Sequence, residues 1–102
     1  MNAKKRKALE AAGFRFGDAQ DLLDLSDTDM EIVEARVRLA RAVRELRTKQ
    51  RLTQKQLAER VGSSQPRVAA VEQGQGTLEQ LIRFMFALGA DRKKVARAIA
   101  AA

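Results

Sequence analysis

The stretch 52–74 constrains the fold of this chain more than any other part of the sequence. Thr53 is a favourable helix N-cap, and Gln56 stands three residues later, where the second member of a capping box belongs. A short apolar periodicity follows and ends at Gly62, a residue type that reverses the chain through positive φ without steric conflict. The stretch therefore predicts two short helices joined by a tight glycine turn, which is the helix-turn-helix unit.

The second helix of this unit is predicted from the residues that follow the turn. Ser63 and Ser64 offer a second N-cap, and Pro66 is tolerated in a first turn, whose N–H groups have no partner within the helix. The outer face of the unit is polar and basic, and its members are Gln54, Lys55, Gln65 and Arg67. An ordinary helical hairpin inside a small bundle would also fit this pattern. The tight turn and the basic outer face favour DNA binding over that alternative.

The composition indicates a small basic domain without catalytic machinery. The 102 residues suffice for one domain with a core, and the hydrophobic content of 45% argues against general disorder. The net charge of +7 favours a polyanionic partner such as nucleic acid. Because the chain has no His, Cys, Tyr or Trp, we expect neither enzyme activity nor a cofactor. No apolar run approaches the ~20 residues that span a membrane, so we expect a cytoplasmic protein without membrane contact.

Capping residues and apolar periodicity predict an all-α fold. Ser26 begins a capping box with Asp29, ahead of a long helix. Thr77 begins another with Gln80, and Asp91 can cap the last helix. The five expected core helices are at 27–50, 53–61, 64–73, 77–88 and 91–100.

The long helix carries two apolar faces at helical spacing. The broader face is expected to cover the helix-turn-helix core, and it consists of Ile32, Ala35, Leu39, Ala42, Val43 and Leu46. The narrower stripe is expected to carry N-terminal leucines or another subunit, and it consists of Met30, Val33, Val37 and Ala40. In the helix at 77–88, Phe84 and Phe86 widen the apolar surface. They either fill the core of the monomer or form part of a dimer interface.

Residues 1–26 are predicted to form an extension, with a basic tail and then a short acidic helix near 18–25, ahead of a domain at 27–102. From Phe16 to Glu34 there are seven acidic residues and no basic one. We interpret these acids as a solvated face and as helix-start charges. They lack the glycine turn and terminal glutamate of a calcium loop, so no metal site is expected. The candidate partner-binding residues of the extension are Phe14, Phe16, Leu22 and Leu23.

The central stretch resembles the Cro/repressor-like helix-turn-helix family, often called XRE. The shared pattern stands here as Leu52-Thr53-Gln54, Leu57-Ala58, Gly62, Ser63-Ser64 and Glu72-Gln73-Gly74. The resemblance covers about two thirds of the chain when the flanking helices are included. It implies a five-helix bundle, here with a short N-terminal helical extension. The chain departs from the family at two points. Arg51 replaces a usual glycine, so either this residue adopts positive φ or the turn is drawn differently. The link after Gly74 is also shorter and lacks proline.

The resemblance implies that the second helix of the motif enters the major groove of DNA. The DNA-contacting residues would be Gln54, Lys55, Ser63, Ser64, Gln65, Pro66, Arg67 and Ala70. Gln65 can bond adenine through two hydrogen bonds, whereas Pro66 and Ala70 offer only apolar contact. The family pattern also implies an ion pair between Arg47 and Glu72. A homodimer that presents two recognition helices to a palindromic operator follows from the same resemblance.

The N-terminal part resembles, more loosely, antitoxins of the RelE/HigB-type toxin–antitoxin systems. This resemblance implies an autorepressor that holds a small basic toxin, for which an acidic segment is a suitable partner. Three hypotheses about function stay open. The first is a transcriptional repressor that acts as an antitoxin. The second is a stand-alone or phage-type regulator without a toxin, and the third is a protein-bridging module with the same fold.

Overall fold

The computed structural model describes residues 25–101, which form five helices and no strand. The helices are α3 (Asp27–Lys49), α4 (Gln54–Val61), α5 (Gln65–Glu72), α6 (Leu78–Ala87) and α7 (Arg92–Ala100). The all-α class and the five expected core helices are confirmed, and every expected helix end lies within one residue of the observed one. The short helix expected near 18–25 falls almost entirely outside the described residues. The same holds for the candidate partner-binding residues Phe14, Phe16, Leu22 and Leu23.

Local sequence determines where each helix begins. Every helix starts after a side chain that accepts a hydrogen bond from a backbone N–H of the first turn. These N-cap residues are Ser26, Thr53, Ser64, Thr77 and Asp91. At α3, α4 and α6 the side chain of the third helical residue also accepts a hydrogen bond from the backbone N–H of the N-cap residue. These three helix starts therefore have a full capping box, as the sequence predicted.

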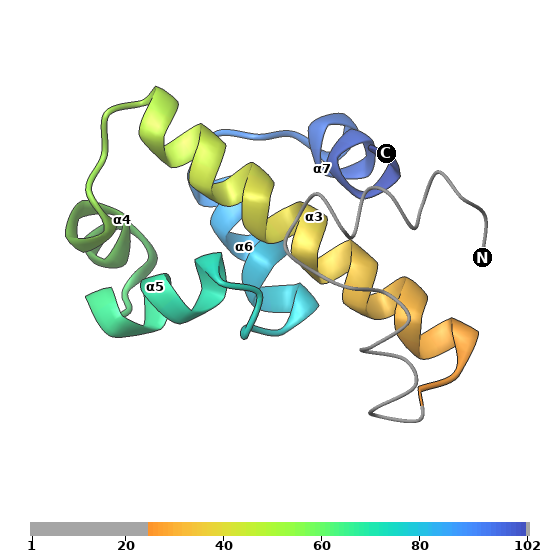
Figure 1. The fold of residues 1–102 in the computed structure, drawn as a ribbon. Helices are drawn as coiled ribbons and strands as arrows, with labels where there is room; N and C mark the ends of the chain where they lie inside the picture. The colour runs from red at the N-terminus through yellow and green to blue at the C-terminus, as the bar shows by residue number, and fades with distance from the viewer. Residues whose placement is uncertain (1–24, 102) are drawn as a thin grey trace.

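The long helix α3 runs through the centre of the fold, with α4 and α5 on one side and α7 on the other (Figure 1). Helix α6 makes the most extensive contact with α3, and both α5 and α7 also pack on it. Helix α4 packs mainly on α5 and on α6. The pair α4–α5 is thus a helix-turn-helix unit that packs against α3 and α6.

The two helices of this unit contribute few residues to the core. Helix α4 buries only Leu57 and Ala58, and α5 buries only Val68 and Val71. The other large buried core residues are Leu39 and Val43 of α3, Leu81, Phe84 and Met85 of α6, Leu88 at the end of α6, and Val95 of α7. Most of the surface of α4 and α5 is therefore free to meet a partner.

The N-terminal third of α3 departs from the predicted faces. Ile32, expected on the core-facing stripe, is 37% exposed, whereas Met30 from the narrower stripe is fully buried. Glu34, expected among the solvated acids, is only 1% exposed and forms an ion pair with Arg38. Arg38 also donates to the backbone carbonyl of Ile99 in α7 at 3.0 Å. Both expectations were wrong because periodicity identifies the faces of a helix but not which neighbours cover them.

Phe84 and Phe86 on α6 lie in different environments. Phe84 is buried in the core, whereas Phe86 is 48% exposed. The first residue therefore fills the monomer core, and the second leaves an apolar ring at the surface. Among the described helices, none combines the length and the apolar character that crossing a membrane requires.

One helix end differs from the others in residue type. Helices α4, α5 and α6 are followed by glycines at positive φ, namely Gly62, Gly74 and Gly89. After α3 the residue at positive φ is Arg51, with φ of 58°. The positive φ considered for Arg51 in the sequence is thereby confirmed, and it is the only non-glycine residue with this conformation among residues 25–101.

Candidate nucleic-acid interface

The turn at Gly62 sets the start of α5 beside the start of α4. Gly62 has φ of 69°, and the next N–H, that of Ser63, bonds the carbonyl of Ala58 at 2.8 Å. Ser64 then caps α5, and Pro66 occupies the first turn, where it removes no intrahelical hydrogen bond. The chain therefore reverses within three residues, and the exposed N-terminal ends of both helices lie at one edge of the molecule.

Helix α5 has one buried face and one exposed face, as expected of a recognition helix. Its two valines are buried, and Gln65, Pro66 and Arg67 are exposed. Ala70 is half-buried one turn further along. The exposed part of the helix thus offers one amide, one cation and two small apolar groups.

The other residues that the sequence predicts to contact DNA differ in their exposure to solvent. Lys55 and Ser64 are exposed, and Gln54 is half-buried. Ser63 is also half-buried, and its hydroxyl oxygen is inaccessible and has no hydrogen-bond partner. The structure therefore presents Ser64, rather than Ser63, at the surface of the turn.

A chain of side-chain amides joins the two helices of the unit. The Nε2 of Gln65 donates to the Oε1 of Gln54 at 2.7 Å. The Nε2 of Gln54 in turn donates to the Oε1 of Glu72 at 3.2 Å. Because Glu72 is an acceptor only, its carboxylate determines which way the Gln54 amide is oriented.

The carboxylate of Glu72 is itself held by Arg47 of α3. Two hydrogen bonds, at 2.6 Å to Oε2 and 3.0 Å to Oε1, make this a bidentate pair. The side chains are only 12% and 4% exposed, respectively. A third nitrogen of Arg47 donates to the carbonyl of Leu52 at 2.8 Å, so that one guanidinium fixes both the end of α5 and the turn before α4. The four side chains from Arg47 to Gln65 form one network, which we call the amide relay.

A shallow groove of about 400 Å³ follows the exposed face of α5 and is closed by the loop after it. Its lining residues are Ser64, Pro66, Arg67, Ala70, Val71, Gln75, Gly76 and Gln80. A Cβ at Gly76 would lie 2.8 Å from Cγ2 of Val71, so the loop approaches α5 as closely as glycine permits. Sequence reasoning missed Gln75, Gly76 and Gln80 as neighbours of α5. The capping box placed Gln80 at a helix start, but nothing in the sequence indicated which helix it would face.

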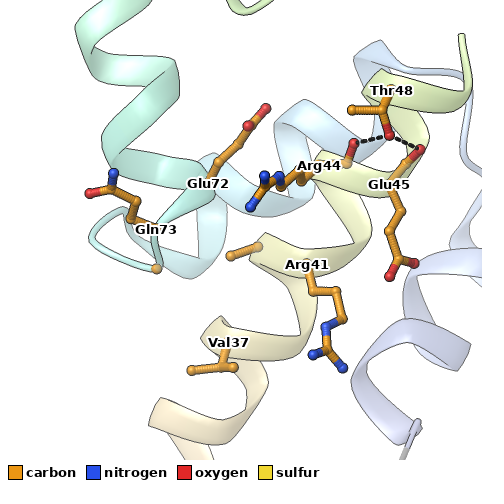
Figure 2. Close-up of a pocket in the computed structure, with 9 residues that line it drawn as sticks. Val37, Arg41, Arg44, Glu45, Thr48, Glu72 and Gln73 are labelled. Carbon is orange, nitrogen blue, oxygen red and sulfur yellow. Dashed lines mark hydrogen bonds between the residues drawn. The ribbon is translucent and has the colours of Figure 1, made fainter. Parts of the chain in front are cut away.

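A second groove, of about 550 Å³, lies between α3 and the C-terminal end of α5. Arg44 extends across it toward Glu72, whereas Arg41 points away (Figure 2). The hydroxyl of Thr48 hydrogen-bonds the backbone carbonyls of Arg44 and Glu45, at 3.0 and 3.1 Å. This groove therefore lies at the end of α5 farthest from Gln65. Within the described part of the chain, no group of three or more potential ligand side chains could hold a metal ion.

Together the tight glycine turn, the capped second helix and its exposed polar face define a helix-turn-helix protein. The sequence model of one family, described as a helix-turn-helix domain, matches residues 22–93, and the chain belongs to that family. No curated protein and no solved structure matches the chain significantly. The predicted division between an extension at 1–26 and a domain at 27–102 stays a prediction.

Proposed function

We propose that the protein is a sequence-specific DNA-binding repressor that places α5 in the major groove. The observation that carries this proposal is the position of Gln65. It lies exposed at the N-terminal end of α5, and Gln54 holds its amide at 2.7 Å. Residues near the start of a recognition helix are the ones that reach base edges. The net charge of +7 supports a polyanionic partner for this face.

The amide relay supports adenine as the base that Gln65 contacts. Gln54 turns its oxygen toward Gln65 because its nitrogen is committed to Glu72. Gln65 therefore uses one amide hydrogen within the protein and keeps its oxygen and second amide hydrogen available. These two atoms match the N6 amino group and N7 of adenine in the major groove. The protein thus holds the amide in one orientation before DNA arrives, which lowers the entropy lost on binding.

The other exposed residues suit the backbone and the thymine methyl group. Arg67, Lys55 and Ser64 can bond phosphates, which position the protein without reading sequence. Pro66 and Ala70 line the groove beside α5 and offer apolar contact to a methyl group. With a single polar base reader of this kind, much of the affinity comes from phosphate contacts and falls as salt rises.

Removing Gln65 and removing Arg67 are expected to have different effects. Gln65→Ala should relax the preference at one base pair, a loss of ~1–3 kcal/mol of discrimination. Arg67→Ala should weaken binding to all duplexes about equally and lower the salt slope by about one unit. The operator is first selected from randomised duplexes with the wild-type protein. Binding of both variants to this operator and to a scrambled duplex is then measured across a salt series.

Two outcomes of this experiment contradict the proposal. If Gln65→Ala loses affinity equally for both duplexes, Gln65 is not a base reader. If the wild-type protein selects no preferred duplex, the protein is not a sequence-specific repressor. A protein-bridging module with the same fold would give that second result.

The proposal extends to a homodimer that acts in the cytoplasm on a palindromic operator. Two recognition helices about 34–36 Å apart would meet successive turns of the major groove. The exposed ring of Phe86 supports a protein contact, because exposed aromatic rings are common at interfaces. Sedimentation with and without operator DNA tests this part of the proposal. A monomer bound to a single half-site would contradict it.

A finer proposal is that this repressor is the antitoxin of a small basic RelE/HigB-like toxin. It rests on the acidic stretch from Phe16 to Glu34, whose first three acids, Asp18, Asp21 and Asp24, lie outside the described residues. Co-expression with the product of the adjacent gene, followed by purification of the complex, tests it. A stand-alone or phage-type regulator would bind the same operator without such a partner.

A further inference from the structure

We propose that Arg51 is a phosphate-binding residue of the DNA interface, kept at a strained backbone position for its positive charge. This inference rests on the proposed function, and it adds a contact from outside the two helices of the motif. Three observations carry it. They are the backbone conformation of Arg51, the environment of its side chain, and its connection to the amide relay.

The backbone after α3 adopts the same turn as the backbone after α4, α5 and α6. In all four, the N–H of the residue at positive φ bonds the carbonyl three residues earlier. The next N–H bonds the carbonyl five residues earlier. This is the Schellman arrangement of a helix C-terminus. At three of the four ends the residue at positive φ is glycine, and at the fourth it is Arg51. The same turn therefore exists in this chain with and without a side chain at that position.

A side chain at this position destabilises the folded state. The left-handed conformation brings Cβ too close to the following carbonyl oxygen, so glycine adopts it more easily than any other residue. No hydrogen bond or ion pair of the Arg51 side chain within residues 25–101 offsets this strain. Its side chain is exposed, and none of the hydrogen bonds or ion pairs among residues 25–101 involves it. Strained residues of this kind are concentrated at functional sites.

The turn that carries Arg51 is fixed to the amide relay. The carbonyl of the next residue, Leu52, accepts a hydrogen bond from Arg47 at 2.8 Å. Through Glu72 the same guanidinium holds Gln54, which touches Gln65. The turn and the base-contacting end of α5 are therefore parts of one rigid assembly.

The charge around this turn suits a phosphate rather than a base. Lys49, Arg51 and Lys55 are all exposed, and the segment 46–58 contains no acidic residue. A duplex that receives the start of α5 in its major groove must pass the adjoining start of α4, because Gln54 and Gln65 are in contact. The nearest parts of that duplex beyond the groove are its phosphates, and arginine bonds them without reading sequence. A rigid turn presents this guanidinium with little loss of backbone entropy.

Replacing Arg51 with glycine is expected to change stability and DNA binding in opposite directions. The melting temperature should rise by about 4 °C because the strain is relieved. Affinity for a mixed-sequence DNA duplex should fall about fivefold at 0.15 M salt, and the salt slope should fall by about 0.9, because one fewer counterion is released. The operator and the scrambled duplex should lose affinity by the same factor. Thermal unfolding and fluorescence anisotropy across a salt series measure these quantities.

Three matched variants isolate the charge. Arg51→Lys retains charge and strain, so its salt slope and melting temperature should equal those of the wild type. Arg51→Asn tolerates positive φ but is neutral, so it should lose affinity as Arg51→Gly does. Arg97→Gln removes one exposed charge on α7, which lies on the other side of α3 from the motif (Figure 1). Its salt slope should equal that of the wild type.

The inference is overturned if Arg51→Gly and Arg51→Asn bind DNA with the affinity and salt slope of the wild-type protein. It is also overturned if Arg97→Gln reduces the slope as much as they do, because general charge would then explain the effect. In both cases Arg67→Ala still tests the proposed function separately. If the wild-type protein binds no duplex at low salt, the proposed function itself fails, and the role of Arg51 fails with it.

Discussion

Replacing Glu72 with alanine is expected to lower the free energy of unfolding by about 3–5 kcal/mol. The guanidinium of Arg47 would lose both carboxylate hydrogen bonds, and its side chain is only 12% exposed in the native structure. An unpaired buried charge is strongly destabilising, because the protein interior solvates it poorly. The Gln54 amide would also lose its acceptor. Urea unfolding followed by circular dichroism measures the effect.

Two comparisons test whether the buried pair is the cause. Glu79→Ala breaks the exposed pair between Glu79 and Arg83, whose side chains are 82% and 66% exposed, respectively. This substitution should therefore lower the free energy of unfolding much less. Adding Arg47→Met to Glu72→Ala removes the orphaned charge, so the double variant should be more stable than Glu72→Ala alone. Equal losses for Glu72→Ala and Glu79→Ala would show that burial of the pair contributes nothing.

Replacing Leu57 with alanine is expected to destabilise the fold by about 2–5 kcal/mol. Leu57 is fully buried and, with Ala58, is one of only two residues that α4 buries. The substitution would therefore leave a cavity where the motif meets the core. At about 4–8 °C of melting temperature per kcal/mol, the shift is easily measured by thermal unfolding.

Leu57→Met is the matched control for this prediction. It nearly conserves volume, so it should destabilise the protein by less than about 1.5 kcal/mol. A melting temperature for Leu57→Ala that equals that of Leu57→Met would indicate that α4 is not anchored through this residue.

The helix starts could be predicted from sequence because their determinants are local. Each capping box lies within four residues, so Ser26, Thr53 and Thr77 can be recognised as N-cap residues without knowledge of the fold. The unusual backbone at Arg51 could also be anticipated, because a turn that needs positive φ keeps that requirement whatever residue occupies it.

The environment of the first third of α3 could not be predicted in the same way. Ile32 and Met30 both satisfy helical periodicity, yet Ile32 is exposed and Met30 is buried. Glu34 gave no sign of burial, because an i,i+4 pair with arginine is usually a surface feature. Which face of a helix is covered depends on contacts between distant segments, such as the one between Arg38 and the last turn of α7.

The four side chains of the amide relay could be named from the sequence, but the bond that joins them into one network could not. The resemblance to repressors placed Gln54 and Gln65 together on the DNA-contacting face and paired Arg47 with Glu72. The hydrogen bond from Gln54 to Glu72, which joins the two pairs into one relay, depends on the packing of α4 against the end of α5. That bond has no signature in the sequence, because the two residues are 18 positions apart.

The small share of α5 in the core has a consequence for how proteins of this type diverge. Val68 and Val71 are its only buried residues, and Glu72 anchors its end through Arg47, so most of its other residues can change without disturbing the fold. New operator preferences can therefore arise by mutation while the scaffold stays intact. The exception is position 65, whose partner at position 54 lies on another helix. Loss of the glutamine at position 54 leaves Gln65 without the partner that orients its amide, so evolutionary change at position 54 should be accompanied by change at position 65.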